Sequence, residues 1–347
     1  MIPHSRPLLD HHDHSNVLDV LESGYLVQGR EVARFEERLS SFIGVRYGAA
    51  VSSGTAALHL ALIALSVGEG DEVIIPSYVC SALLNAVMYV RATPVIADID
   101  RVTLNIDAGD VKRRITKKTK AVIVPHMFGL PADLDGIMAL GLPVIEDCAQ
   151  SIGALYGGKR TGSFGVCSVY SFYTTKMIAA GEGGMLLSDD ERFIETVRDL
   201  RDYDEKDTYA VRFNYKMTDI HAALGLSQLK KLPHFIQKRK EIADRYNDVL
   251  TEKGVATPPV PPGRDHVYFR YVLQCGDPST LIEGMNARGI ECRRPVFKPL
   301  HEYIGLKGYP VAHGVAGRAV SVPLYPSLMD NEVEHIIKSL KTLPIRD

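Results

Sequence analysis

One lysine stands where the chain could present a reactive amine. Residues 168–176 run from an apolar, β-prone stretch into a polar turn that ends at Lys176, and a glycine-rich stretch follows at residues 181–184. A lysine withdrawn from water loses its proton more readily, and only the neutral amine attacks a carbonyl carbon. A lysine after a strand is more commonly a solvated surface residue. This segment alone therefore leaves a catalytic and a solvated lysine as alternatives.

Two further segments offer chemistry that complements an amine. Residues 51–58 form a turn of small residues that opens a helix, where free N–H groups, the helix dipole and the Thr55 hydroxyl suit an anion. Asp147 ends an apolar run, and its carboxylate could pair with a protonated ring nitrogen. The plainer alternatives are an ordinary helix N-cap for the first segment and a cap on the following turn for Asp147.

Strands and helices must alternate to position these residues. Between about residues 50 and 190 the chain has apolar, β-branched runs separated by helical stretches. We predict strands at 71–76, 93–97, 121–125 and 143–147, and helices at 55–67 and 134–140. Runs that are apolar on both faces are typical of a parallel sheet covered by helices. Because such sheets bind ligands at the carboxyl ends of their strands, Asp147 and the neighbouring loops are the expected site.

The pattern changes after Thr218. A long helix is expected from residue 219, interrupted at Pro233, and a proline-rich connection follows. Further along we predict a strand at 267–274 and helices at 281–288 and 331–340. This organisation predicts a large domain at residues 1–234, including an N-terminal segment, and a small C-terminal domain at residues 235–347.

Composition narrows the class of protein. The 347 residues carry 40 basic and 42 acidic side chains, a formal net charge of −2, which argues against nucleic acid or a membrane surface as partner. No apolar stretch approaches the length of a membrane span, and the first residues lack the apolar core of a secretory signal. The five cysteines are scattered without a Cys-x-x-Cys pair. We therefore expect a cytoplasmic protein.

Taken together, the motifs resemble the DegT/DnrJ/EryC1/StrS family of sugar aminotransferases, which are pyridoxal-phosphate enzymes of fold type I. The resemblance runs essentially from end to end of the chain. It rests on the segments 23–29, 53–58, 70–74, 143–150, 172–176, 181–184 and 214–219. It implies an α/β fold of the aspartate aminotransferase type, with a mainly parallel, seven-stranded central sheet flanked by helices and a smaller C-terminal α/β domain.

The resemblance also implies roles for individual residues. Lys176 would hold pyridoxal 5′-phosphate as a Schiff base and shuttle a proton, with Asp147 at the pyridine nitrogen and Gln150 near the ring hydroxyl. The phosphate would be held by Gly54, Thr55, Ala56 and Ser171. Asn214 matches an asparagine that reaches the phosphate from the neighbouring subunit, so a homodimer with shared active sites is expected.

The sequence departs from the family pattern at two positions. The family commonly stacks an aromatic residue on the cofactor ring, but Cys80 falls at that position and Tyr78 lies two residues earlier. A thiol covers less of a ring than an aromatic side chain does, and we favour Cys80 as the smaller neighbour over a shift that brings in Tyr78. Arg212 replaces a glycine that the family usually has before Asn214.

Two clusters have more than one explanation. Arg293, Lys298 and His301 lie where the family often contacts substrate, and a basic cluster suits the phosphates of a nucleotide-linked sugar. An exposed basic turn is the alternative. Residues 11–14 hold three histidines that could bind a metal, but we favour a solvated N-terminal segment.

The predicted reaction is transamination of a keto-sugar, with glutamate as the amino donor implied by the resemblance. One alternative is a pyridoxal-phosphate-dependent sugar dehydratase, whose relatives often carry histidine in place of the lysine, so Lys176 favours transamination. The other alternative is a regulatory protein that binds pyridoxal phosphate without turnover.

Overall fold

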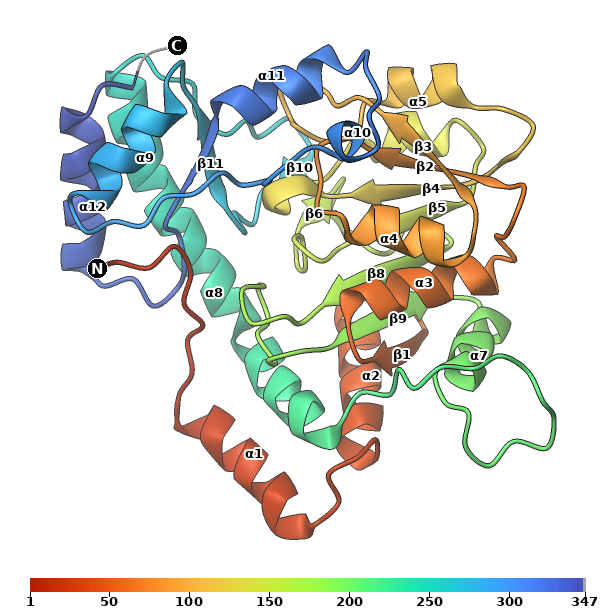
Figure 1. Cartoon of the computed structure of the whole chain (residues 1–347). Coiled ribbons are helices and arrows are strands. Elements are labelled where there is room, and N and C mark those ends of the chain that lie inside the picture. Colours follow the sequence, from red (N-terminus) through yellow and green to blue (C-terminus); the bar gives the residue numbers. More distant parts are fainter. Residues whose placement is uncertain (346–347) are drawn as a thin grey trace.

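A seven-stranded sheet forms the centre of the molecule (Figure 1). The computed structural model describes residues 1–345. The strands lie in the order β1-β9-β8-β5-β4-β2-β3, and β9 alone runs against its neighbours. They are β1 (Tyr47–Val51), β2 (Glu72–Pro76), β3 (Thr93–Ala97), β4 (Thr119–Pro125), β5 (Val144–Asp147), β8 (Cys167–Ser171) and β9 (Gly184–Ser188). The expectation of a mainly parallel sheet is confirmed.

Helices cover both faces of this sheet. Those of the large part are α1 (His11–Ser23), α2 (Arg30–Ile43), α3 (Gly54–Ala64), α4 (Ala82–Tyr89), α5 (Ala108–Arg114), the 3-10 turn η1 (Met127–Gly129), α6 (Leu134–Met138), α7 (Glu191–Leu200) and α8 (Asp219–Glu252). Alternate residues of one strand face different layers: Val73 and Ile75 pack in the core with α3 and α4, whereas Ile74 packs with α5 and α6. This alternation explains why the strands are apolar throughout.

A second hydrophobic core lies in the C-terminal part. It joins the end of α8 to the two-stranded sheet β11 (Tyr271–Gln274) and β12 (Ala319–Val322) and to the flanking helices. The remaining elements are β6 (Leu155–Tyr156), β7 (Lys159–Arg160), β10 (Arg264–Asp265), α9 (Pro278–Asn286), α10 (Leu300–Tyr303), α11 (Pro310–Arg318) and α12 (Asp330–Thr342). Ile2 pairs with Ile290, so the start of the chain joins this core as well.

Two elements differ from their expected limits. The helix expected to be interrupted at Pro233 instead runs through it as α8. Leu232 and Phe235 on either side are buried, and their packing outweighs the lost hydrogen bond. The strand expected at residues 267–274 begins only at Tyr271. Tyr268 takes a left-handed conformation with φ 50°, and its N–H donates to Nδ1 of His266 at 2.9 Å, which turns the chain before β11.

Among residues 1–345, every helix is too short or too polar to cross a membrane.

Candidate active site

A cavity of about 280 Å³ opens where the strands β2, β5 and β8 end, as the sheet topology predicts. Its lining comes from the loop after β2, from η1 and from the loops after β5 and β8, with residues 269–270 and 295–298 of the C-terminal part opposite. Lys176, Cys80 and Gln150 all contribute to it. A larger cavity of about 860 Å³ lies between α1, α2 and α8 and contains none of the residues expected in the site.

Lys176 lies on the wall of the smaller cavity as a partly buried amine. Burial lowers the pKa of Lys176, and the nearby charge of Arg270 lowers it further, although Cys80 and Asp147 oppose both effects. The Nζ atom lies 5.3 Å from the centre of the Phe269 ring. These surroundings increase the fraction of neutral, nucleophilic amine, which is the property that covalent capture of an aldehyde requires.

Asp147 and Gln150 are held at the end of β5 and in the loop that follows. Asp147 is 7% exposed, and burial raises the pKa of its carboxyl while the N–H of Ala149 and the charge of Lys176 oppose that rise. Oε1 of Gln150 accepts a 2.8 Å hydrogen bond from the N–H of Phe128, a residue in the left-handed region at φ 58°. Gln150 thus fixes a strained turn beside the cavity.

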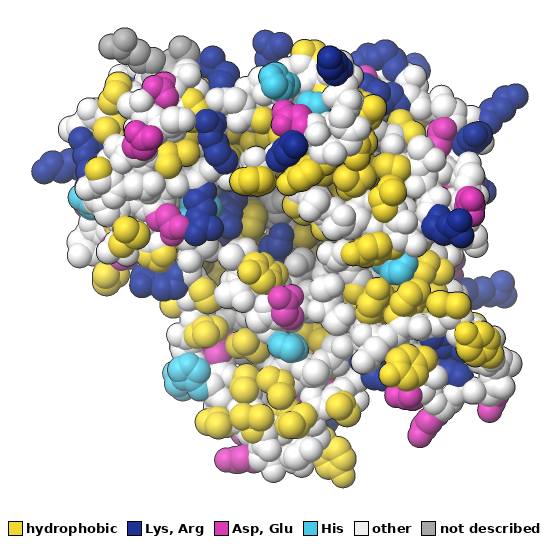
Figure 2. All heavy atoms as spheres, viewed as in Figure 1, with side chains coloured by type: hydrophobic (Ala, Val, Ile, Leu, Met, Phe, Trp, Pro, Cys, Tyr) yellow, Lys and Arg dark blue, Asp and Glu magenta, His cyan; other side chains and the backbone are white. Residues whose placement is uncertain are grey.

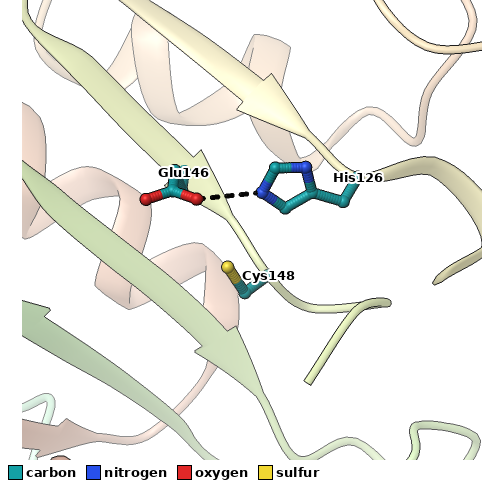
Figure 3. A group of neighbouring side chains, drawn as sticks. All are labelled: His126, Glu146 and Cys148. Atoms are coloured by element: carbon teal, nitrogen blue, oxygen red, sulfur yellow. Dashed lines mark hydrogen bonds and ion pairs between the residues drawn. The ribbon is translucent and has the colours of Figure 1, made fainter. Parts of the chain in front are cut away.

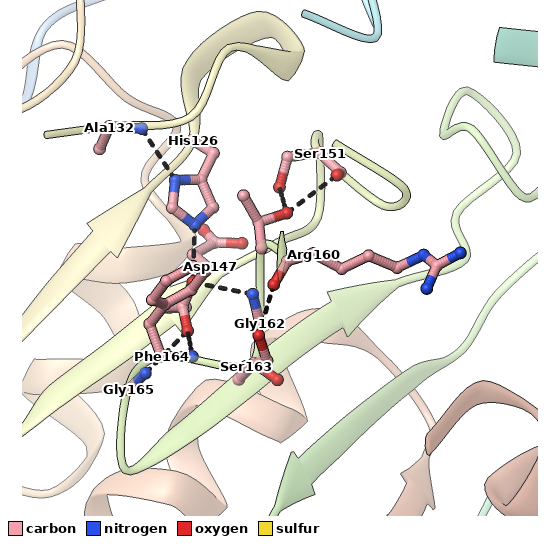
Figure 4. A network of polar contacts seen from close by, with 12 residues as sticks. His126, Ala132, Asp147, Ser151, Arg160, Gly162, Ser163, Phe164 and Gly165 are labelled. Carbon is pink, nitrogen blue, oxygen red and sulfur yellow. Dashed lines mark hydrogen bonds and ion pairs between the residues drawn. The ribbon is translucent and has the colours of Figure 1, made fainter. Parts of the chain in front are cut away.

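A buried polar network lies directly behind Asp147 (Figures 3 and 4). The two oxygens of Glu146 accept from Nε2 of His126 and from the N–H groups of Gly162, Phe164 and Gly165, at 2.7 to 3.2 Å. Burial alone would raise the pKa of Glu146, but these donors outweigh it and hold the pKa below its usual range. The network fixes the end of β5, from which Asp147 projects.

His126, Glu146 and Cys148 lie close enough together to be compared with a metal site (Figure 3). Nδ1 of His126 accepts the N–H of Ala132 at 3.0 Å, so its proton must be on Nε2, which donates to Glu146. Each oxygen of Glu146 already accepts two hydrogen bonds. The donor set is therefore satisfied within the protein and favours positioning over metal binding.

The turn before α3 has the form of a phosphate cradle. Ser53 caps the helix by accepting from the N–H of Ala56, and the N–H groups of the first turn have no partner within the helix. A Cβ built at Gly54 would lie only 2.9 Å from the Cβ of Ser171, and one at Gly184 would collide with the Ser53 carbonyl. Glycine at both positions thus brings the helix start and Ser171 together, an arrangement that fits the phosphate of pyridoxal phosphate.

The structure separates Cys80 from Tyr78. Cys80 lines the cavity close to Lys176 and Asp147, and burial raises the pKa of its thiol. Tyr78 is fully buried in the core, with its ring 6.3 Å from that of Phe128. Cys80 therefore lines the cavity and Tyr78 does not, and contact of Cys80 with the cofactor ring stays a prediction.

Asn214 is exposed, and its side chain makes no hydrogen bond within residues 1–345. The adjoining turn is fixed by Arg212, whose Nε donates to Asp199 at 2.9 Å and whose NH1 donates to the carbonyl of Thr208. Arg212 therefore takes over by hydrogen bonds the turn that the family usually makes with glycine.

Of the three residues expected to contact substrate, only Lys298 lines the cavity. Lys298 lines the cavity, with its Nζ 5.0 Å from the Tyr303 ring centre. Arg293 lies outside the lining and pairs with Glu291. His301 is buried, with Nδ1 2.5 Å from Oγ of Ser77, so its position gives no support to substrate contact. The physical reason is packing, because the short helix α10 turns His301 inward.

The N-terminal histidines His11, His12 and His14 are exposed, as the solvated alternative predicts. Asp13 between them is buried and bonded to Lys231 and Gln228.

Sequence reasoning missed Arg270, which lines the cavity beside Lys176. It lies within residues 267–274, which were interpreted only as a strand. The available signal was a single charge in an otherwise apolar run.

The seven-stranded α/β fold, the lysine in the loop after β8 and the carboxylate at the end of β5 define an enzyme of the pyridoxal-phosphate-dependent fold type I class. Comparison with known proteins makes this specific. The model of the DegT/DnrJ/EryC1/StrS aminotransferase family matches residues 7–341, and the chain belongs to that family. It is therefore a pyridoxal-phosphate-dependent aminotransferase.

Individual relatives match over nearly their whole length. A GDP-perosamine synthase of Caulobacter vibrioides is 35% identical, covering 96% of both chains. The UDP-N-acetyl-3-dehydro-alpha-D-glucosamine 3-aminotransferase of Acidithiobacillus ferrooxidans is 34% identical, covering 91% of this chain and 89% of that protein. The structure of the putative sugar aminotransferase Spr1654 of Streptococcus pneumoniae in its PMP form superposes with a TM-score of 0.94 at 28% identity, covering 98% and 97% of the two chains.

Proposed function

We propose that this aminotransferase moves an amino group from glutamate to the ketone of a nucleotide-linked keto-sugar. The observation that carries the proposal is Lys176, an amine with a lowered pKa on the wall of a cavity that Gln150 and Lys298 also line. The printed names of two relatives, one GDP-linked and one UDP-linked, support a nucleotide sugar as the acceptor.

Each residue has a defined task in the proposal. When bound, pyridoxal phosphate supplies the aldehyde that accepts the amino group and the ring that withdraws electrons from the reacting carbon. Lys176 holds the cofactor and moves the proton at the reacting carbon. Asp147 keeps the pyridine nitrogen protonated, and Gly54, Thr55, Ala56 and Ser171 bind the phosphate. Lys298 is placed to neutralise a phosphate of the sugar nucleotide.

We further propose a homodimer in which Asn214 completes the partner's phosphate site. Asn214 is exposed and has no hydrogen bond within residues 1–345, so its amide is available to a second chain. Exposed hydrophobic side chains, including Leu18 and Leu21 on α1 and Met88 and Tyr89 on α4, support burial against a partner. In Figure 2 hydrophobic side chains gather over α1 and α3.

We also propose that the enzyme works in the cytoplasm. All five cysteines, each within the described part of the chain, are free thiols, which suits a reducing compartment.

The substitution Lys176→Ala tests the proposed reaction. The variant should lose the visible absorbance of covalently held cofactor and all conversion of glutamate with keto-sugar acceptors, because it lacks the amine that forms the covalent bond and moves the proton. Lys238→Ala on the exposed face of α8 is the matched control and should retain both properties. Wild-type activity in the Lys176 variant would refute the assignment, and release of ammonia without an amino-sugar product would indicate the dehydratase alternative.

A further inference from the structure

We propose that Arg270 binds the α-carboxylate of the amino donor. The inference rests on the proposed function, since it assigns a residue to one of its two substrates. Arg270 lines the cavity from the side of the C-terminal part, opposite the strand ends. In Figure 2 basic side chains surround a hollow near the centre of the molecule.

The guanidinium of Arg270 has hydrogen-bond donors to spare. Its Nη1 donates to Nδ1 of His4 at 3.1 Å, whereas a guanidinium has five N–H groups in all. Within residues 1–345, no carboxylate lies at ion-pair distance from Arg270. Its neighbour Arg293, by contrast, pairs with Glu291. A partly buried arginine without an acidic partner presents a positive charge that an anionic ligand can neutralise.

His4 positions Arg270 without cancelling its charge. Nδ1 accepts from Arg270, so Nε2 carries the proton and donates to Oγ of Ser321 at 2.9 Å. Burial, together with Arg270 and Arg293, lowers the pKa of His4 to about 3, and the ring is neutral at neutral pH. The N–H of His4 is in turn held by Glu291. These contacts fix the direction of the guanidinium in advance of binding.

The position of Arg270 suits an α-carboxylate in particular. Its Cζ lies 4.8 Å from the centre of the Phe269 ring, the same ring against which Nζ of Lys176 lies. In an α-amino acid the carboxylate is bonded to the carbon that carries the amine, so it must lie within a few ångströms of the reacting nitrogen. A guanidinium accepts such a carboxylate through two parallel hydrogen bonds.

A phosphate of the sugar nucleotide is negatively charged like the α-carboxylate of the donor, but it fits a different part of the cavity. Lys298 lies next to Phe297, whose side chain is 92% exposed at the mouth. The nucleotide is the part of that substrate farthest from the ketone, so its phosphates belong toward the mouth. Arg270 lies beside the reacting amine instead, which favours the carboxylate.

The affinity of the holoenzyme for the donor tests the proposal. Binding of 2-methylglutamate, which has both carboxylates but no α-hydrogen to lose, can be followed through the cofactor absorbance without turnover. Arg270→Gln should raise its dissociation constant about 10- to 100-fold, as expected for a lost charge-assisted pair. Arg270→Lys keeps the charge but cannot make two parallel hydrogen bonds, so its dissociation constant should lie between those of wild type and Arg270→Gln. Lys238→Gln removes a charge from the exposed face of α8, outside the cavity lining, and should change the constant less than twofold.

A comparison of two donors isolates the α-carboxylate. The first half-reaction is measured with L-glutamate and with 4-aminobutyrate, which lacks only that group. Wild type should prefer L-glutamate in kcat/KM, and Arg270→Gln should lose most of this preference, so the two changes are not additive. Equal losses for both donors, or a loss confined to the sugar-nucleotide half-reaction, would overturn the assignment.

The two proposals fail in different ways. If wild type converts no amino acid, the proposed donor is wrong. If wild type converts glutamate and Arg270→Gln binds 2-methylglutamate as tightly as wild type does, the donor stands and the role of Arg270 is wrong. Arg270→Lys, with its charge retained, keeps the test valid if the glutamine variant does not fold.

Discussion

Lys176 and Arg270 are two cations that share one cavity and one aromatic ring, and each disfavours the charge of the other. Burial lowers the pKa of Lys176, and Arg270 contributes to the same direction of shift. Lys176 and Asp147 drew attention because one follows an apolar run and the other ends one, but their roles were expected only from the resemblance to the family. The role of Arg270 was not expected from the sequence. Its place near Lys176 follows the left-handed turn at Tyr268, which brings the C-terminal part to the cavity.

The pH dependence of cofactor capture should report this coupling. Removing Arg270 raises the pKa of Lys176 toward that of an exposed lysine, which lowers the fraction of neutral amine at any given pH. The rate at which cofactor-free Arg270→Gln forms the visible-absorbing cofactor complex should therefore rise at higher pH than in wild type. Lys298→Gln is the control and should leave the profile in place. A profile shifted to lower pH would contradict the coupling.

Tyr78 should be dispensable as a phenol. Its hydroxyl is buried without a hydrogen-bond partner within residues 1–345, and such a group costs about 1–3 kcal/mol. We expect Tyr78→Phe to raise the free energy of unfolding in urea or leave it unchanged, with the cofactor spectrum unaltered. A lost or shifted cofactor band would instead assign Tyr78, and not Cys80, to the ring.

At the scale of elements, the sequence predicted which segments form helices and strands better than it predicted where each element begins and ends. The strand runs at 71–76, 93–97, 121–125 and 143–147 correspond to β2, β3, β4 and β5, because a parallel sheet demands apolar residues on both faces. The interruption at Pro233 was wrong, because tertiary packing along α8 outweighs a single missing hydrogen bond. The boundary at residue 234/235 stays a prediction. Many residues from Ile242 onward share a separate core, but others, such as Val272 and Leu300, pack in the core of the large sheet.

The loop between β7 and β8 depends on one carboxylate. Glu146→Ala would leave the N–H groups of Gly162, Phe164 and Gly165 and the Nε2–H of His126 without their acceptor. We expect the free energy of unfolding to fall by about 3–5 kcal/mol, and cofactor affinity to fall with it as Asp147 loses its support. Urea unfolding and cofactor titration measure the two effects. Glu241→Ala on the exposed face of α8 should leave the free energy of unfolding nearly unchanged, and an equal loss at both sites would contradict the role of the network.

At the scale of the whole molecule, two buried histidines should make the fold sensitive to acid. Burial lowers the pKa of His4 and of His266 to about 3, whereas both protonate near 6.5 when unfolded. Between these pH values the unfolded chain thus binds more protons than the folded chain. The free energy of unfolding therefore falls as the pH falls through that window, by up to about 1.4 kcal/mol per pH unit for each histidine. Urea unfolding between pH 7 and 4 measures this pH dependence, and the free energy of unfolding of His4→Gln should change less steeply with pH.

Shared active sites predict complementation between inactive variants. Lys176→Ala lacks the amine, and Asn214→Ala should lack the cross-subunit contact to the phosphate. When the two proteins are unfolded together and refolded, mixed dimers contain one site with both residues, so activity should return. Mixing without refolding is the control. No recovery, with mixed dimers demonstrated by mass, would exclude a shared site.

The contact of His4 with Ser321 has a consequence for synthesis. These residues are 317 positions apart, so His4, which is synthesised first, cannot make this contact until almost all of the chain has been synthesised. Arg270 can be translated and packed against Phe269 while the histidine that will orient it is still loose. Closing so long a loop costs conformational entropy, and it also completes the core that Ile2 shares with the C-terminal part. We therefore expect the proposed donor pocket to form late in folding, and a bulky extension before Met1 to delay the appearance of activity.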